Sequence, residues 1–182
     1  MHTPIPGREC GTCNVCCEEP TINVPELKKP PGILCPHCRA GEGCLIHQRR
    51  PQVCRDFFCG WRCNAGLDED WRPDRSDILI EQIGRNMPEG FEHAPFHYKF
   101  TLLGAPDKIY WPPLVQYISA LVGQNVPVML AVIGRPGYVA GQVLVNEALR
   151  PHVAAHSIGG TASTLARLLQ LCIDHPQAKV DP

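Results

Sequence analysis

The residues of this sequence best suited to chemistry are its thiols, and they are concentrated at one end of the chain. Ten of the eleven cysteines lie within the first 63 residues: Cys10, Cys13, Cys16, Cys17, Cys35, Cys38, Cys44, Cys54, Cys59 and Cys63. Thiolates are strong ligands for soft metal ions. An odd cysteine count and an N-terminus without a secretion signal argue against a disulfide scaffold. We therefore predict a cytoplasmic protein with a metal-binding region, and an unmetallated redox thiol cluster is the alternative.

The segment "CGTCNVCC", residues 10–17, has the spacing of a metal-binding loop. In a Cys-x-x-Cys turn such as Cys10 to Cys13, both sulfurs can point at one ion, and the intervening amides can hydrogen-bond to them. Cys16 follows at the same interval. Three cysteines so spaced form the loop that binds a 4Fe-4S cluster, with a distant cysteine as fourth ligand. The pattern favours an iron–sulfur cluster, while a second turn, Cys35 to Cys38, keeps Zn2+ as the alternative.

Cys16 and Cys17 are adjacent in the chain, which constrains how they can bind. Successive side chains diverge, so two neighbouring thiols cannot easily face one small ion. The pair therefore predicts either two sites, or one site with a thiol in reserve.

A second segment, "GCLIHQRRPQVCRDFFC" at residues 43–59, extends the pattern. Together with "CGTCNVCC" and the spaced Cys35, it resembles the YkgJ-type cysteine cluster proteins, a zinc- or iron-chelating family. The resemblance covers about residues 10–61. It implies eight metal ligands, which are Cys10, Cys13, Cys16, Cys17, Cys35, Cys44, Cys54 and Cys59. Cys38 and Cys63 are additional to the family pattern. His47, where the family usually has tyrosine, would make Cys44-x-x-His47 a further ligand pair.

Four arginines and three aromatic residues accompany the later cysteines; they are Arg49, Arg50, Arg55, Arg62, Phe57, Phe58 and Trp61. A four-thiolate zinc site carries a formal charge of about −2, which nearby guanidinium groups would offset while donating to sulfur. We predict that the aromatic rings form a small hydrophobic core over the metal region.

Composition divides the chain into three parts. Residues 1–63 are rich in Cys, Gly and Pro and show no sustained periodicity, so metal cross-links would have to supply their stability. Within them, residues 21–24 predict a short strand. Residues 64–76 are polar and predict a connector, and residues 77–182 predict conventional secondary structure.

In the third part, the hydrophobic pattern predicts strands at 77–83 and 96–102 and a helix at 112–123. Two apolar runs around Arg135-Pro136-Gly137 predict a hairpin with a type II turn. A final helix is expected over residues 161–174. The predicted fold class is α+β, an irregular cysteine-rich, metal-stapled N-terminal module packed on a small, mostly antiparallel sheet with two or more helices.

The eleventh cysteine has a different explanation. Cys172 shares one stripe of the final predicted helix with Leu165, Leu168, Leu169 and Ile173. Buried free cysteine behaves as a small apolar residue, so we expect Cys172 to pack in the core.

Several functions are not favoured by the sequence. The formal net charge of −1 gives no case for nucleic acid binding. The most apolar region, residues 114–134, is interrupted by Gln124, Asn125 and Pro127, so we expect no membrane span. His93 and His97 are expected on the solvent side of a strand, without a paired base or nucleophile.

Three hypotheses remain, and whether the protein is an enzyme stays open. The first is a metal-binding protein that holds an iron–sulfur cluster or zinc and recognises a protein or peptide. The second is an enzyme or accessory subunit in protein or peptide modification that uses the cluster for redox chemistry or positioning. The third is a zinc-stapled interaction module without catalysis.

Overall fold

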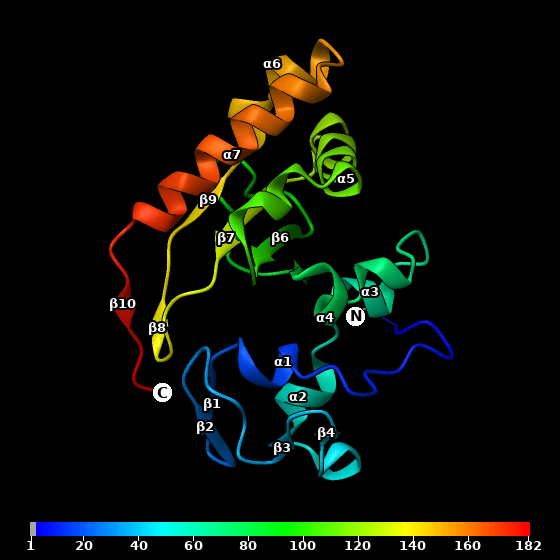
Figure 1. The fold of residues 1–182 in the computed structure, drawn as a ribbon, viewed down its shortest axis with the longest axis vertical. Coiled ribbons are helices and arrows are strands. Elements are labelled where there is room, and N and C mark those ends of the chain that lie inside the picture. The colour runs from blue at the N-terminus through cyan, green and yellow to red at the C-terminus, as the bar shows by residue number, and fades with distance from the viewer. Residues whose placement is uncertain (1–2) are drawn as a thin grey trace. The chain divides into compact units, whose positions relative to one another are not determined.

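The computed structural model describes residues 3–182 and separates into two compact units (Figure 1). The first, here called the cysteine-rich unit, runs to Leu79 and includes residues 133–139 and 177–182. The second, here called the α+β unit, comprises residues 80–132 and 140–176. The first unit thus extends beyond residue 63 and takes in two later pieces of the chain.

Regular structure in the cysteine-rich unit is short. Up to residue 76, each helix or strand is two to five residues long: α1 Val15–Glu18, β1 Ile22–Val24, β2 Leu27–Lys29, β3 Cys38–Arg39, β4 Gly43–Cys44, η1 His47–Arg49, α2 Gln52–Asp56, α3 Gly60–Cys63, η2 Glu69–Trp71 and α4 Pro73–Ser76. The predicted strand at 21–24 is confirmed by β1. Helices and ribbons this short are not stable alone, so their position depends on side-chain contacts.

Three antiparallel ribbons shape this unit. β1 pairs with β2, and β3 pairs with β4 so that Cys38 lies opposite Cys44. The third joins β8 Tyr138–Val139 to β10 Ala178–Lys179. A small buried cluster contains Ile22, Leu27, Cys35 and Cys38. Two of its four members are cysteines, so thiols form part of this core.

Residues 64–76 are more than a polar connector. They contain the short helices η2 and α4, and the side chains of Leu67 and Trp71 are buried. Arg8 donates hydrogen bonds to the carbonyl oxygens of Trp61, Asn64 (2.8 Å) and Leu67. This segment therefore packs as part of the cysteine-rich unit.

The α+β unit is built on a four-stranded sheet in the order β5-β6-β7-β9 (Figure 1). Its elements are β5 Ile78–Ile83, β6 His97–Leu102, η3 Pro106–Tyr110, α5 Pro112–Gly123, β7 Val128–Val132, β9 Gln142–Leu144, α6 Asn146–Ala154 and α7 Ile158–Asp174. β6 and β7 are parallel, and β7 and β9 are antiparallel. The predictions of strands at 77–83 and 96–102 are confirmed.

Helices α5 and α7 both contact β7 and each other. The predicted helix at 112–123 is confirmed, and its predicted apolar stripe is the buried one: Leu114, Val115, Ile118, Leu121 and Val122. α7 begins earlier than residue 161, because the Ser157 side chain caps it by accepting from the Gly160 amide at 3.2 Å. Cys172 is buried as expected, with its thiol 3.7 Å from the carbonyl oxygen of Leu130. Ile173, expected on the buried stripe, is 38% exposed.

Helix α6 is absent from the sequence prediction. Pro151 lies inside it, and only Asn146 and Leu149 are buried along it. Interior proline is unfavourable in helices and weak burial leaves little periodicity, so the local pattern did not indicate this element.

The predicted hairpin is confirmed. The amide of Tyr138 donates to the carbonyl of Arg135 at 2.9 Å, and Gly137 has φ +84°, as a type II turn requires. The two apolar runs pair through β7 and β9, which are antiparallel with Met129 opposite Leu144 and Ala131 opposite Gln142, a register centred on the turn. β8, next to the turn, pairs with β10 instead.

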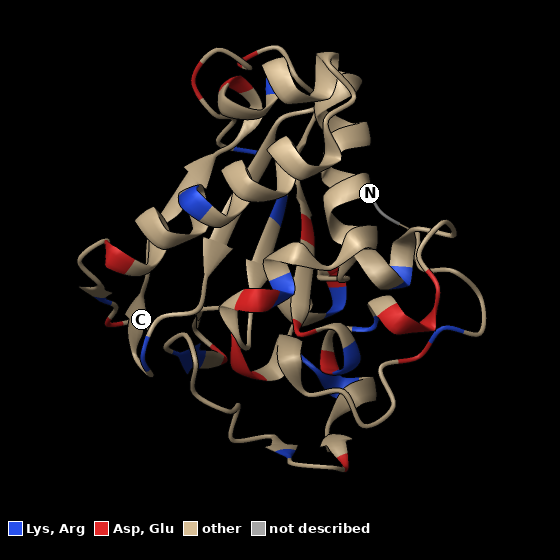
Figure 2. Cartoon of the chain, turned by 45° about the horizontal axis from the view of Figure 1, so that its top comes forward, with Lys and Arg blue, Asp and Glu red and all other residues tan. Residues whose placement is uncertain are grey.

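The fold class is therefore mixed α+β, with seven α-helices in the described residues and small, mostly antiparallel sheets. Positive and negative residues are interspersed along the chain (Figure 2). Within residues 3–182, every helix falls short of the length or the apolar character that crossing a bilayer requires.

Candidate metal centre

All eleven cysteines are free thiols, and nine of the N-terminal ten fall into two groups. The first thiol group is Cys10, Cys13, Cys16 and Cys59. Cys16 and Cys59 share a hydrogen bond between their side chains, and Cys10 and Cys13 lie near enough to influence the ionisation of Cys16. This group joins the Cys-x-x-Cys-x-x-Cys loop to one distant cysteine.

The second thiol group is Cys17, Cys35, Cys38, Cys44 and Cys54. The side chains of Cys17 and Cys38 share a hydrogen bond, and Cys44 and Cys35 influence the ionisation of Cys17. Cys54 has the same two electrostatic neighbours, Cys35 and Cys44. Cys17 and Cys54 also pack against the buried cluster that contains Cys35 and Cys38.

The adjacent cysteines separate at helix α1. Successive residues of an α-helix point about 100° apart, so neighbouring side chains leave the helix in different directions. Cys16 contacts Cys59, and Cys17 contacts Cys38. One turn of helix therefore contributes one thiol to each group.

Backbone amides donate hydrogen bonds to two sulfurs of the first group, those of Cys13 and Cys59. The amide of Cys13 donates to the carbonyl of Cys10 at 3.0 Å, which closes the turn, and the amide of Val15 donates to the sulfur of Cys13. At the start of α3, the amides of Trp61 and Arg62 donate to the sulfur of Cys59. Amide-to-sulfur bonds of this kind favour the thiolate and support metal-ligating cysteines.

Short-range pairing assembles the second group. The amide of Cys38 donates to the carbonyl of Cys35 at 2.8 Å, and the β3–β4 ribbon sets Cys44 opposite Cys38. The amide of Cys35 donates to the carbonyl of Cys17 at 2.9 Å. The thiol of Cys38 donates to Oδ1 of Asn14 at 3.3 Å, so the residue before α1 also belongs to this group's surroundings.

Gly43 allows the two loops to approach. It has φ +83°, and a Cβ placed on it would lie 2.7 Å from the carbonyl oxygen of Gly11. Only glycine avoids both the left-handed strain and this clash. The Cys10–Cys13 turn can therefore lie against the strand that carries Cys44.

Ionisation within the first group is uneven. The hydrogen bond from Cys16, followed by the amide and the charge of Arg62, lowers the pKa of Cys59 to about 7 against desolvation by burial. The same hydrogen bond, with burial, raises the pKa of Cys16. Burial raises the pKa of Cys13 to about 11. Cys59 thus loses its proton most readily, whereas the raised pKa values of Cys13 and Cys16 favour their protonated forms unless a cation binds.

In the second group, burial is the main effect. Desolvation raises the pKa values of Cys17, Cys38 and Cys54, and neighbouring thiols add to the increase at Cys17. The charge of Arg50 partly offsets the increase at Cys54.

The arginines and aromatic residues divide between these groups and the surface. Nη1 of Arg62 donates to the sulfur of Cys10 at 3.6 Å, and its guanidinium carbon lies 5.3 Å from the centre of the Phe58 ring. Arg55 instead donates to Gln52 on the surface. Trp61 is 3% exposed, whereas Phe57 and Phe58 are half-buried.

The two remaining candidate ligands lie apart from the main contacts. Cys63 is half-buried on α3, and burial raises its pKa, with Cys59 and Arg62 as its electrostatic neighbours. His47 is exposed on η1. Burial of part of its ring, and then the charges of Arg50 and Arg62, lower its pKa. Their roles as ligands stay predictions.

The donor set and its surroundings fit a thiolate-bound metal or cluster. Three buried side-chain donors of this unit lack a hydrogen-bond partner within the described part of the chain: Nε of Arg50, Nε1 of Trp61 and Nε of Arg62. Unpaired buried donors are costly, and an anionic sulfur-rich centre supplies acceptors. Across residues 3–182, no three or more Cys, His, Asp or Glu side chains converge tightly enough to hold an ion as they stand. Within each thiol group, two cysteines form a hydrogen-bonded pair, and the other cysteines are their electrostatic neighbours.

Sequence reasoning missed several residues around the thiols. Asn14 and Arg8 act through hydrogen bonds that connect distant segments, and no local pattern indicates such contacts. Lys29 is buried beside the second group. Alternation after buried Leu27 could have identified Lys29, because residues two apart in a strand share a face.

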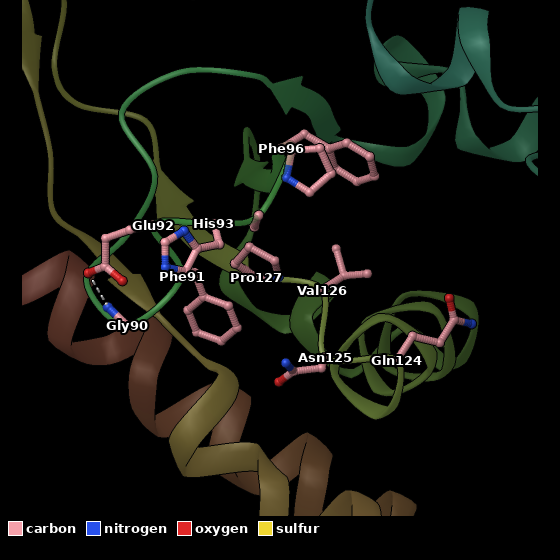
Figure 3. Close-up of a pocket in the computed structure, with 11 residues that line it drawn as sticks. Gly90, Phe91, Glu92, His93, Phe96, Gln124, Asn125, Val126 and Pro127 are labelled. Atoms are coloured by element: carbon pink, nitrogen blue, oxygen red, sulfur yellow. Dashed lines mark hydrogen bonds between the residues drawn. The ribbon is translucent and has the colours of Figure 1, made fainter.

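The α+β unit has a pocket of about 400 Å³ (Figure 3). Residues 90–96 line one side and residues 124–127 the other. Glu92 accepts a hydrogen bond from the amide of Gly90 at 2.8 Å through one carboxylate oxygen. His93 is exposed there, but His97, expected on the solvent side, is 6% exposed. No described residue of the lining is a cysteine, serine or threonine that could act as nucleophile.

Comparisons with known proteins give no relative: no family model, no curated protein and no solved structure matches this chain. The resemblance to the YkgJ-type cysteine cluster proteins therefore stays a prediction from the motifs within residues 10–61.

Proposed function

We propose that this protein binds metal through its two thiol groups, in a reducing compartment such as the cytoplasm. The observation that carries the proposal is the separation of adjacent Cys16 and Cys17 into different groups. The odd cysteine count, and the gathering of more than two thiols in each group, favour metal ligation over a set of paired disulfides.

The first thiol group would hold an iron–sulfur cluster. Three of its cysteines follow the Cys-x-x-Cys-x-x-Cys spacing and Cys59 is the distant fourth, which is the ligand pattern of a 4Fe-4S centre. Such a cluster supplies one-electron redox chemistry when bound. Amides of Trp61 and Arg62 would stabilise the thiolate of Cys59, and Arg62 would offset its charge.

The second thiol group would hold a separate metal centre built on the Cys35–Cys38 turn. Its five cysteines exceed the four that a tetrahedral zinc ion or a cubane cluster takes from protein. Zinc in both groups is the alternative form of the proposal, and it would supply structural stability without redox chemistry.

Anaerobic purification followed by elemental analysis tests the proposal. We expect brown protein with visible thiolate-to-iron absorption, iron and acid-labile sulfide. Colourless protein with stoichiometric zinc would support the zinc form. Protein purified anaerobically without metal, and unable to take up iron, sulfide or zinc afterwards, would contradict the proposal.

A further inference from the structure

Lys29 is buried to an unusual degree for a lysine. It is 1% exposed, and no other lysine among residues 3–182 is in the buried class. A buried ammonium is costly unless it is paired, because it loses its hydration. Its surroundings should therefore contain a group that needs a positive charge.

Its strand directs Lys29 toward the second thiol group. Leu27 and Lys29 are the buried positions of β2, and Lys28 between them is exposed. Leu27 belongs to the buried cluster with Cys35 and Cys38. Because side chains two apart in a strand share a face, Lys29 lies on the face that meets these cysteines.

Hydrogen bonds fix the ammonium in place. Nζ donates to the carbonyl oxygen of Glu18 at 2.5 Å and to that of Pro30 at 2.9 Å. Glu18 ends helix α1, which carries Cys17. An ammonium has three donors, so one is left after these two carbonyls.

Thiols are the foremost electrostatic partners of this lysine. Burial lowers the pKa of Lys29, and the largest opposing effect comes from Cys35, followed by Glu19 and Cys17. In the described residues, no carboxylate oxygen lies within 4.0 Å of its ammonium.

We propose that Lys29 is the fixed counter-charge of the second thiol group, which offsets the negative charge that its cysteines acquire when they bind a metal ion. This inference rests on the proposed function and assigns a positioning residue to one of its two sites. Lys29 also ties Cys17 to β2 through the carbonyl of Glu18. The first thiol group would use Arg62 for the same purpose.

Cobalt binding by the full, reduced, metal-free chain tests this assignment. Co2+ is a probe for thiolate sites, and its thiolate-to-metal absorption reports binding directly. The chain would carry Cys10→Ser and Cys59→Ser, so that the second group provides the signal, and a competing chelator would give the affinity. The variants are Lys29→Gln, Lys29→Met and Lys29→Arg, with Lys28→Gln as the matched exposed control.

We expect Lys29→Gln and Lys29→Met to weaken Co2+ binding about tenfold or more, because the thiolate charge loses its partner. Lys29→Arg, which keeps the charge but not the shape, should weaken binding less than Lys29→Gln, and Lys28→Gln should stay within about twofold of the parent. Glutamine keeps a donor for the two carbonyls, so its loss of affinity separates charge from hydrogen bonding. If circular dichroism shows that Lys29→Met is unfolded, the Co2+ affinities of Lys29→Gln and Lys29→Arg test the assignment without it.

Two results would overturn the assignment. Equal Co2+ affinity for Lys29→Gln and the parent would show that the charge is not needed, while leaving the proposed function intact. Equal weakening by arginine and glutamine would show that shape matters rather than charge. If the chain with all its cysteines also takes up no Co2+, iron or zinc, the proposed function fails together with this inference.

Discussion

The two units of the molecule bury different kinds of side chain. The α+β unit has a conventional apolar interior, in which Phe100, Ile118, Leu130 and Leu165 are each 0% exposed. The interior of the cysteine-rich unit combines apolar side chains, such as those of Leu27 and Trp71, with Cys35, Cys38, Cys59 and Lys29. Burial of apolar surface can stabilise the first kind of interior, whereas under the proposed function metal–thiolate bonds would contribute to the second.

Element lengths follow the same division. α5 and α7 have 12 and 17 residues, while elements up to residue 76 have two to five. Long amphipathic helices gain stability by packing one face on a sheet. Short turns gain little from burial, so we expect metal–thiolate bonds to supply the difference. The following predictions test this contrast, from the largest expected effect to the smallest.

Removing metal should affect the two units very differently. Metal–thiolate bonding is worth about 10–16 kcal/mol in zinc-finger peptides, and its loss unfolds such domains. Chelation under reducing conditions should abolish amide hydrogen-exchange protection within residues 10–63. Helices α5 and α7 should keep theirs. Equal loss of protection in both regions, or in neither, would contradict the contrast.

A cavity in the α+β unit should destabilise that unit without releasing metal. Leu165 on α7 is 0% exposed, so Leu165→Ala should cost about 2–5 kcal/mol in the free energy of unfolding. Leu171 on the same helix is 59% exposed, and Leu171→Ala is the matched control with a cost below about 1 kcal/mol. Denaturant unfolding gives the costs. Metal lost from Leu165→Ala while it stays folded would show that the units are not independent.

Glycine substitutions sharpen the contrast within the cysteine-rich unit. Gly41 and Gly43 both have positive φ, but only a Cβ on Gly43 would meet a backbone atom, the carbonyl oxygen of Gly11 at 2.7 Å. Gly41→Ala should cost about 1–2 kcal/mol of conformational strain. Gly43→Ala should cost more and weaken metal retention against a chelator. The same cost for both variants would mean that the Gly11–Gly43 contact is unimportant.

The smallest effect concerns one thiol. The pKa of Cys59 is lowered to about 7 from an ordinary 9.0, so its ionisation stabilises the metal-free fold above pH 9, and this contribution is lost as pH falls through 7. Thiolate absorbance of the metal-free chain should show a step near pH 7. Cys59→Ser should remove that step, whereas Cys172→Ser should keep it. A step that persists in Cys59→Ser belongs to another thiol.

Sequence periodicity predicted the α+β unit well where neighbours along the chain determine structure. The five buried residues of α5 and the buried Cys172 follow from helical spacing. The hairpin follows from the turn at Arg135–Gly137, around which β7 and β9 pair, whereas the pairing of β8 with β10 is nonlocal and no local pattern indicates it. His97 was placed on the wrong side because strand alternation gives faces and not what covers each face.

The candidate site was predictable in its residues but not in its grouping. Spacing identified the Cys10, Cys13, Cys16 loop, and adjacency indicated that Cys17 would diverge. Nothing local indicates that Cys59 joins the first group or that Cys38 joins the second, because those contacts depend on how the loops fold back. The hydrogen bond that Asn14 accepts from Cys38, and the one that Lys29 donates to Glu18, are nonlocal in the same sense.

The central claim is that adjacent cysteines serve two separate metal sites, and metal content per chain tests it most directly. Cys16→Ser, Cys17→Ser and the double variant would be purified anaerobically beside the parent, with Cys172→Ser as the control. We predict that each single variant loses the metal of one group and keeps the other, that the double variant loses nearly all, and that Cys172→Ser loses none. Complete loss of metal in both single variants, or loss of the same metal in both, would contradict two separate sites.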